Sequence, residues 1–192
     1  DYCISLIENL NIKKILINSF YLKEQINEFV KNHTYNVEIK VIEDGDNILD
    51  TGGGILNLIN RSDEENFLVF NPDTIWNKDY TKTINEMIKF YFLNSNRNTL
   101  LVVDKNLSFD KNLKGDFKLT NNLLKKNDHN DFIYIGCQIL NRSLFENYKV
   151  RNFSILEIWN ELLKKNRLNG FESFNKFFHL TNLETFKKLK DL

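Results

Sequence analysis

The residues of this chain best suited to chemistry on phosphates are one aspartate and three consecutive glycines. Asp73 follows the apolar run 67–70 in an Asn-Pro-Asp turn that holds the only proline of the chain. The run predicts a fully buried strand, and open α/β sheets bind their ligands beyond the carboxyl ends of such strands. A carboxylate there is a hard oxygen ligand that suits Mg²⁺, although a plain turn aspartate explains the position equally well.

The glycines lie in the segment 50–54, which reads Asp-Thr-Gly-Gly-Gly and precedes a short predicted helix over 55–60. A glycine turn before a helix lets the backbone approach a ligand closely and offers several N–H donors, which suits a nucleotide. A tight turn without a ligand explains the triplet equally well. Neither GxxxxGK[ST] nor GxGxxG is present, which disfavours a P-loop ATPase and a Rossmann dinucleotide site.

Two weaker candidates have competing explanations. Asp44-Gly45-Asp46 has the form of the DxD motif of metal-dependent glycosyltransferases, but its glycine and polar neighbours favour a solvated turn. His179 lies in the aromatic segment 177–180, where a packed histidine is the usual case and contact with a metal or a phosphate is the alternative.

The hydrophobic pattern predicts the elements that must position these residues. Apolar residues alternate between helical and strand spacing, which indicates a single α/β domain with helices on a sheet. Asp1 is expected to cap the first helix, and Ser154 with Glu157 has the spacing of a capping box. The expected helices cover 1–10, 21–31, 55–60, 79–93, 142–148, 154–165 and 182–192, and the expected strands cover 12–18, 37–42, 67–70, 99–103, 115–119, 131–140 and 177–180.

Composition excludes several classes of protein. The 192 residues contain 26 Lys and Arg against 26 Asp and Glu, so no overall field favours nucleic acid or an anionic membrane. Cys3 and Cys137 match no metal or disulfide spacing, which favours a reducing compartment. The sequence contains no run of about 18 apolar residues, the length that a membrane span requires. We therefore expect a cytoplasmic protein that binds neither nucleic acid nor membrane.

Four blocks, taken in order, carry a resemblance to a known family. They are LDTGGGI at 49–55, FLVFNPDTIW at 67–76, GDF at 115–117 and YIGCQIL at 134–140. In order and spacing they resemble the sugar-1-phosphate nucleotidyltransferases of nucleotide-sugar biosynthesis. The nearest branch holds N-acetylmuramate-1-phosphate uridylyltransferases, which serve the cell envelope, and mannose-1-phosphate guanylyltransferase-like proteins. The likeness covers essentially the whole chain.

This resemblance implies a fold and a reaction. The fold is a Rossmann-like, mixed and mostly parallel sheet flanked by helices. In the reaction an oxygen of the sugar 1-phosphate attacks the α-phosphorus of an NTP, here UTP or GTP, and pyrophosphate leaves without a covalent enzyme intermediate. The implied roles are nucleotide binding for Thr51, Gly52 and Gly53, catalysis and Mg²⁺ binding for Asp73, and sugar binding for Gly115 and Gly136.

Two departures from the family pattern shape what we expect. The family opens with a strand and a basic Gly-rich loop that grips the triphosphate, and Asp1 aligns with the helix after that loop. We expect a domain over 1–192 that lacks this first strand and loop and is inactive alone. His179 stands where the family has a second metal-binding aspartate, so it is a candidate ligand for a softer ion such as Mn²⁺ or for phosphate. The alternative function is an inactive relative that binds a nucleotide or nucleotide sugar as a sensor or partner subunit.

Overall fold

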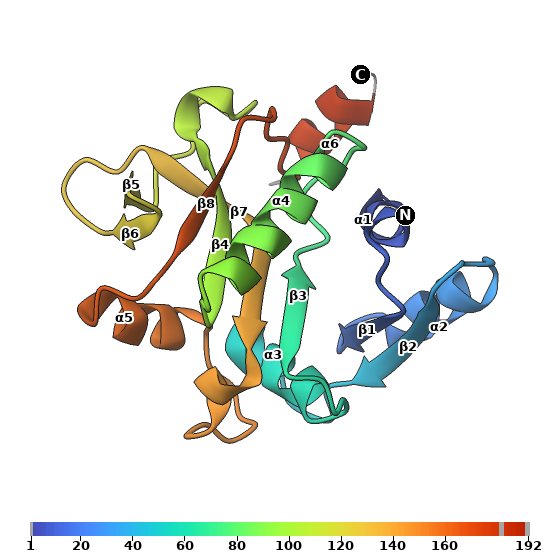
Figure 1. Ribbon diagram of the computed structural model, residues 1–192. Coiled ribbons are helices and arrows are strands. Elements are labelled where there is room, and N and C mark those ends of the chain that lie inside the picture. The colour runs from blue at the N-terminus through green and yellow to red at the C-terminus, as the bar shows by residue number, and fades with distance from the viewer. Residues whose placement is uncertain (1, 181–182, 191–192) are drawn as a thin grey trace.

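Helices pack against both faces of a four-stranded mixed sheet, whose strands run in the order β3, β7, β4, β8 (Figure 1). The computed structural model of the chain describes residues 2–180 and 183–190. β7 pairs antiparallel with β3 and β4, and β8 pairs parallel with β4. The expected α/β class with a mixed sheet is thereby confirmed. The strands are β3 Asn66–Phe70, β4 Asn98–Asp104, β7 Phe132–Asn141 and β8 Gly170–Ser173.

The sheet separates two hydrophobic clusters. Side chains alternate between the two faces along a strand. Ile135 and Ile139 of β7 therefore belong to the cluster on one face of the sheet, and Leu140 belongs to the cluster on the opposite face. Every residue of β4 except Asp104 is buried, as expected of a central strand. The first cluster lies under α4 Tyr80–Leu93, and the second lies under α3 Asp50–Ile59 and α5 Leu156–Lys164.

The N-terminal part of the chain forms a separate pair of parallel strands. β1 Lys14–Ser19 and β2 Glu38–Glu43 are joined by α2 Lys23–Lys31, as the alternating pattern predicted. α1 Tyr2–Ile7 and a 3₁₀ turn, Glu8–Leu10, precede them, and this pair lies on the β3 side of the larger sheet (Figure 1). The expected cap, Asp1, lies outside the described residues.

The sheet is split between β1 and β3. Within the described residues no backbone ladder joins these two strands, so β3 is the edge of the four-stranded sheet. The residues of the run 67–70 are only partly buried, so the prediction of a fully buried strand was wrong. A continuous apolar run predicts a central strand with both faces covered, whereas β3 is an edge strand that pairs only with β7.

The three glycines lie inside α3 rather than in a loop before it. The helix begins at Asp50, whose φ is +57°, and Gly52, Gly53 and Gly54 form its first turns. The predicted glycine turn was therefore wrong in its local structure. Close packing explains why helix-disfavouring residues occur here, because a Cβ on Gly53 would collide with the carbonyl oxygen of Arg151.

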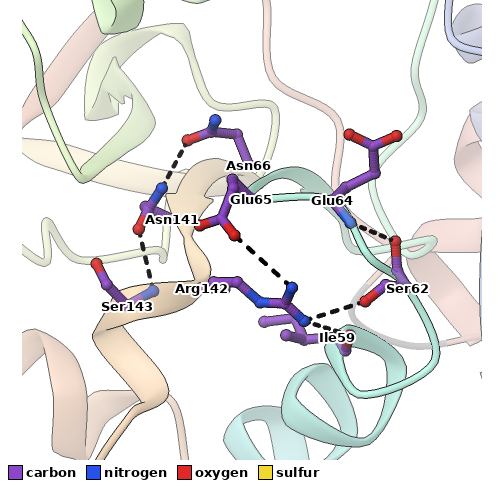
Figure 2. A network of polar contacts seen from close by, with 8 residues as sticks. All are labelled: Ile59, Ser62, Glu64, Glu65, Asn66, Asn141, Arg142 and Ser143. Carbon is purple, nitrogen blue, oxygen red and sulfur yellow. Dashed lines mark hydrogen bonds and ion pairs between the residues drawn. The ribbon is translucent and has the colours of Figure 1, made fainter.

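A polar network at the other end of α3 fixes the helix against the sheet (Figure 2). The guanidinium of Arg142, which follows β7, donates to the carbonyl oxygens of Ile59 and Ser62 at 3.4 and 3.0 Å and pairs with Glu65 at 3.8 Å. Cations near a helix C-terminus satisfy carbonyls that the helix itself leaves unpaired. The network therefore sets where the opposite end of α3, with its glycines, lies.

The segment 177–180 is not the predicted strand. It makes only isolated bridges, Ser108 with Phe177 and Thr74 with His179. β8, which the sequence pattern did not reveal, pairs with β4 instead. Its four residues are too few to show a clear alternation of apolar and polar side chains.

The remaining elements differ from expectation in their details. Only residues 118 and 119 of the expected strand 115–119 lie in a strand, β5, which forms a hairpin with β6. The helix expected over 142–148 is a 3₁₀ turn. The capping box is absent because the Ser154 hydroxyl accepts from Leu156 while Glu157 pairs with Arg151. No helix in the described residues has the length and apolarity needed to cross a bilayer. The bounds of these elements are β5 Lys118–Thr120, β6 Leu123–Lys125, 3₁₀ turns Lys105–Leu107 and Arg142–Phe145, and α6 Leu183–Lys190. Residues 182, 191 and 192 of the expected last helix lie outside the described residues.

Candidate active site

The turn after β3 is held rigidly against β7. The Asn71 amide donates to the Gly136 carbonyl at 2.7 Å, and the Thr74 hydroxyl donates to the Ile135 carbonyl at 2.9 Å. Gly136 has a φ of +84°, and a Cβ there would lie 2.9 Å from Cβ of Asn71. Only glycine fits this position without strain, so Gly136 lets β7 pass close to the turn that carries Asp73.

Asp73 and His179 face each other across this turn. Nε2 of His179 lies 3.2 Å from Oδ2 of Asp73, and 28% of the histidine side chain and 48% of the aspartate side chain are exposed. Backbone hydrogen bonds join the two segments, from the Leu180 amide to the Asp73 carbonyl and from the Ile75 amide to the Phe178 carbonyl. The hydrogen bond from His179 lowers the pKa of Asp73 despite its partial burial. Asp73 is therefore an ionised carboxylate with one oxygen engaged.

The carboxylate of Asp73 suits a metal ion that is shared with a substrate. The described residues contain no group of three or more histidine, cysteine or acidic side chains able to hold a metal. Mg²⁺ usually keeps several waters and binds through one or two carboxylates together with substrate phosphates. The donor set at Asp73 matches that mode and does not match an all-protein cage.

Gly115 lies in a second segment that reaches the same strand. A Cβ on Gly115 would collide with the backbone of Asn130, so this position also depends on close backbone contact. The next residue, Asp116, accepts a hydrogen bond from the Tyr134 amide at 3.0 Å, two residues before Gly136. The two glycines of the expected sugar site therefore belong to adjacent segments.

The sequence assigned no role to Tyr134, which lies in the same part of β7 as Gly136. Its hydroxyl oxygen is buried and has no hydrogen-bond partner within the described residues. Burial raises the pKa of Tyr134 well above its ordinary value, with smaller contributions from Cys137 and Asp73. The sequence showed Tyr134 only as part of an apolar run, in which a hydroxyl gives no signal of its own.

The expected nucleotide residues are engaged with the segment before α5. The amides of Gly52 and Gly53 donate to the Phe153 carbonyl at 2.9 and 3.1 Å, and the Thr51 hydroxyl accepts from the Ile155 amide at 3.0 Å. The N–H donors that a glycine loop would offer to a phosphate are thus already bonded. These residues contact 151–155 rather than Asp73.

Topology still places the start of α3 and Asp73 on the same edge of the sheet. α3 precedes β3 and its C-terminal end is anchored beside the start of that strand, so the N-terminus of α3 lies toward the carboxyl end of β3. A chain of contacts leads the same way. Ile155, which is bonded to Thr51, accepts from the Trp159 amide, and the Trp159 ring packs edge-on against Tyr134 with centroids 4.8 Å apart.

The weaker DxD candidate has a structural explanation. The two carboxylate oxygens of Asp44 accept from the side-chain amides of Asn18 and Asn57, at 2.8 and 3.1 Å. Gly45 has a φ of +87° in an open turn. A groove of about 700 Å³ lies nearby, and Asp73 and His179 are not among its lining residues, which are Phe20, Asp46, Asn47, Ile48, Leu49, Val150, Arg151 and Asn152.

Known proteins resemble this chain in structure rather than in sequence. No protein-family model and no curated protein sequence matches it. HddC from Yersinia pseudotuberculosis complexed with GMP-PN aligns with a TM-score of 0.74 and 20% identity over 97% of this chain and 82% of that one. The inositol-1-phosphate CTP transferase from T. maritima gives 0.74 and 13% identity over 96% and 76% of the two chains. A UDP-glucose pyrophosphorylase complexed with UDP-glucose gives 0.75 and 14% identity over 99% and 84%.

These alignments establish the fold. The chain shares with these three proteins an α/β architecture in which helices flank a mixed sheet.

Proposed function

We propose that this chain forms most of a sugar-1-phosphate nucleotidyltransferase, which joins an NTP to a sugar 1-phosphate and releases pyrophosphate. The observation that carries the proposal is the ionised, half-exposed carboxylate of Asp73 at the carboxyl end of β3, in a fold shared with enzymes of this class. Neighbours solved with GMP-PN and with UDP-glucose make GTP and UTP the first substrates to test.

In this proposal Asp73 holds the phosphates through a divalent ion. Bound Mg²⁺ would neutralise charge that develops on the phosphates as the bond between the α-phosphorus and the pyrophosphate oxygen breaks. The Asp73 oxygen that is not bonded to His179 would be the one available to hold that ion. Such catalysis rests on positioning and charge neutralisation, and it requires no nucleophile from the protein.

The other expected residues surround that centre. The Thr51, Gly52 and Gly53 turn of α3 would lie against the nucleotide, with the peptide groups of Gly52 and Gly53 held in place by Phe153. Gly136 and Gly115 would line the sugar side, where the absence of side chains leaves room for a ring. The nucleotide-side and sugar-side residues would lie at the edge of the sheet that also carries Asp73.

We also propose that one further strand fills the split in the sheet. β1 and β3 each pair on only one side within the described residues, and apolar side chains of β3 remain partly exposed there. A strand inserted between them would complete one continuous sheet and remove two unpaired edges. A loop after that strand would reach the carboxyl edge near Asp73 and could supply the cations that grip the triphosphate.

The test is a pyrophosphate-release assay that crosses the four common NTPs with glucose, mannose and N-acetylglucosamine 1-phosphates. We expect turnover in a protein that carries the additional strand and loop, and little or none in residues 1–192 alone. Nucleotide binding without turnover in the longer protein would contradict the proposal and would support an inactive nucleotide-binding relative.

A further inference from the structure

One ring nitrogen of His179 faces the candidate site, and the other is buried away from solvent. Nε2 lies 3.2 Å from Oδ2 of Asp73. Nδ1 is buried and has no hydrogen-bond partner among the residues that the structure describes. The ring stacks on Phe177 with centroids 5.8 Å apart, and the bridge between Thr74 and His179 holds the backbone beside Asp73.

The two nitrogens differ in what a proton on each would cost. A proton on Nε2 is donated to a carboxylate, which is a charge-assisted hydrogen bond. With the proton on Nδ1, two acceptors, the bare Nε2 and the Asp73 carboxylate, would face each other 3.2 Å apart, and the buried N–H would have no acceptor within the described residues. The surroundings therefore favour the tautomer in which Nε2 carries the proton.

This tautomer leaves no lone pair for a metal ion in the site. Nε2 uses its proton toward Asp73, and the lone pair of Nδ1 points into the protein interior. Turning the imidazole into a ligand through Nε2 would move the proton to Nδ1, where it has no acceptor within the described residues. Direct coordination by His179 is therefore disfavoured for two reasons. Nε2 has no free lone pair, and a proton moved to Nδ1 would have no acceptor within the described residues.

We infer that His179 is a positioning residue, which holds Oδ2 of Asp73 so that Oδ1 is presented to the divalent ion and the substrate phosphates. The inference rests on the proposed function for the ion and phosphates, and it goes beyond that function in separating the roles of the two residues. Residues that orient a ligating group through a hydrogen bond typically change metal affinity by ten- to a hundredfold when they are replaced.

The first test reads the tautomer without any turnover. Long-range ¹H–¹⁵N correlation of the imidazole in residues 1–192 at pH 8 should show the His179 proton on Nε2. Exposed His129 serves as the reference for an unconstrained ring. A proton on Nδ1 would overturn the inference, whatever the enzymatic activity proves to be.

The second test compares two substitutions in the longer protein. His179→Phe keeps a ring to stack on Phe177 but has no donor, and we expect the Mg²⁺ concentration for half-maximal pyrophosphate release to rise about tenfold. The KM of the sugar 1-phosphate should stay within about twofold. His179→Gln places an N–H near the position of Nε2 and should restore the Mg²⁺ requirement to within about threefold of the parent.

The outcomes separate this inference from the proposed function. Failure of both substitutions to change the Mg²⁺ requirement would show that His179 only packs. Equal loss in His179→Gln and His179→Phe, together with a shift in preference among Mg²⁺, Mn²⁺ and Co²⁺, would show direct coordination. A parent protein without pyrophosphate release contradicts the proposed function and with it the catalytic role, whereas the tautomer measurement still decides the hydrogen bond.

Discussion

At the scale of single residues, buried hydroxyl groups divide into those with a partner and those without one. The Tyr91 hydroxyl donates to Oδ1 of Asn66 at 2.7 Å, whereas the Tyr134 hydroxyl has no partner within the described residues. Burial raises the pKa of both phenols, and that of Tyr91 reaches about 12. Replacement by phenylalanine should therefore change the free energy of unfolding differently at Tyr91 and at Tyr134.

Tyr91→Phe should lower the free energy of unfolding by about 1 kcal/mol, because a satisfied hydrogen bond is lost and the Asn66 oxygen keeps one fewer donor. Tyr134→Phe should be neutral or stabilising, because it removes a buried polar atom without a partner. Urea denaturation of the two variants checks the contrast. A larger loss in Tyr134→Phe than in Tyr91→Phe would mean that its hydroxyl is bonded in solution.

The sequence drew attention to some candidate site residues and not to others, for physical reasons. Asp73 was singled out because a lone carboxylate after an apolar run stands out, and the structure places His179 3.2 Å from it. Tyr134 and Asp116 were not assigned roles. Their contact joins residues 18 positions apart, and no local pattern encodes it.

At the scale of elements, α3 shows how tertiary packing overrides local propensity. Three glycines disfavour a helix, yet the contacts with 151–155 and Asn18 require helix positions without side chains. The strands with clear alternation or long apolar runs were predictable, as β4 and β7 show. Short β8 and the β5–β6 hairpin were not, because their pairing partners lie far away in sequence.

Alanine at two of these glycines should separate packing from propensity. Gly53→Ala would push a Cβ into the rigid backbone oxygen of Arg151, and we expect a loss of about 2 kcal/mol or more. Gly54→Ala meets the movable end of the Asn18 side chain at 2.8 Å, and the better helix propensity of alanine offsets part of the cost. Thermal unfolding of both variants is the measurement. Equal losses would show that backbone contact with 151–155 does not set the choice of glycine.

At the scale of the whole molecule, the split between β1 and β3 is the main feature that no local pattern predicted. Secondary-structure patterns report each strand separately and do not report which neighbour it lacks. The partial exposure of β3 is the structural sign that its second side is unpaired.

Hydrogen exchange can test whether an added strand closes this split. In residues 1–192, we expect the amides of β1 and β3 that face the split to exchange quickly, because no strand of the described residues accepts their hydrogen bonds. In a protein extended by the proposed strand they should be protected to the level of β4. Unchanged exchange of β1 and β3 in the extended protein would show that the strand does not insert there.

In the proposed reaction, nucleotidyl transfer would depend on one charge at the edge of the sheet, the carboxylate of Asp73. Asp73→Asn preserves the shape of the side chain and removes the charge that would bind the divalent ion. Asp79→Asn, at an exposed aspartate near the same turn, is the matched control for loss of a negative charge.

The most direct measurement is therefore the rate of pyrophosphate release by the longer protein and its Asp73→Asn variant, at saturating NTP, sugar 1-phosphate and Mg²⁺. We expect a loss on the order of a hundred- to a thousandfold in Asp73→Asn, with the unfolding temperature nearly unchanged. Asp79→Asn should keep the parent rate. Parent-like release by Asp73→Asn would contradict the assignment of Asp73 as the residue on which nucleotidyl transfer depends.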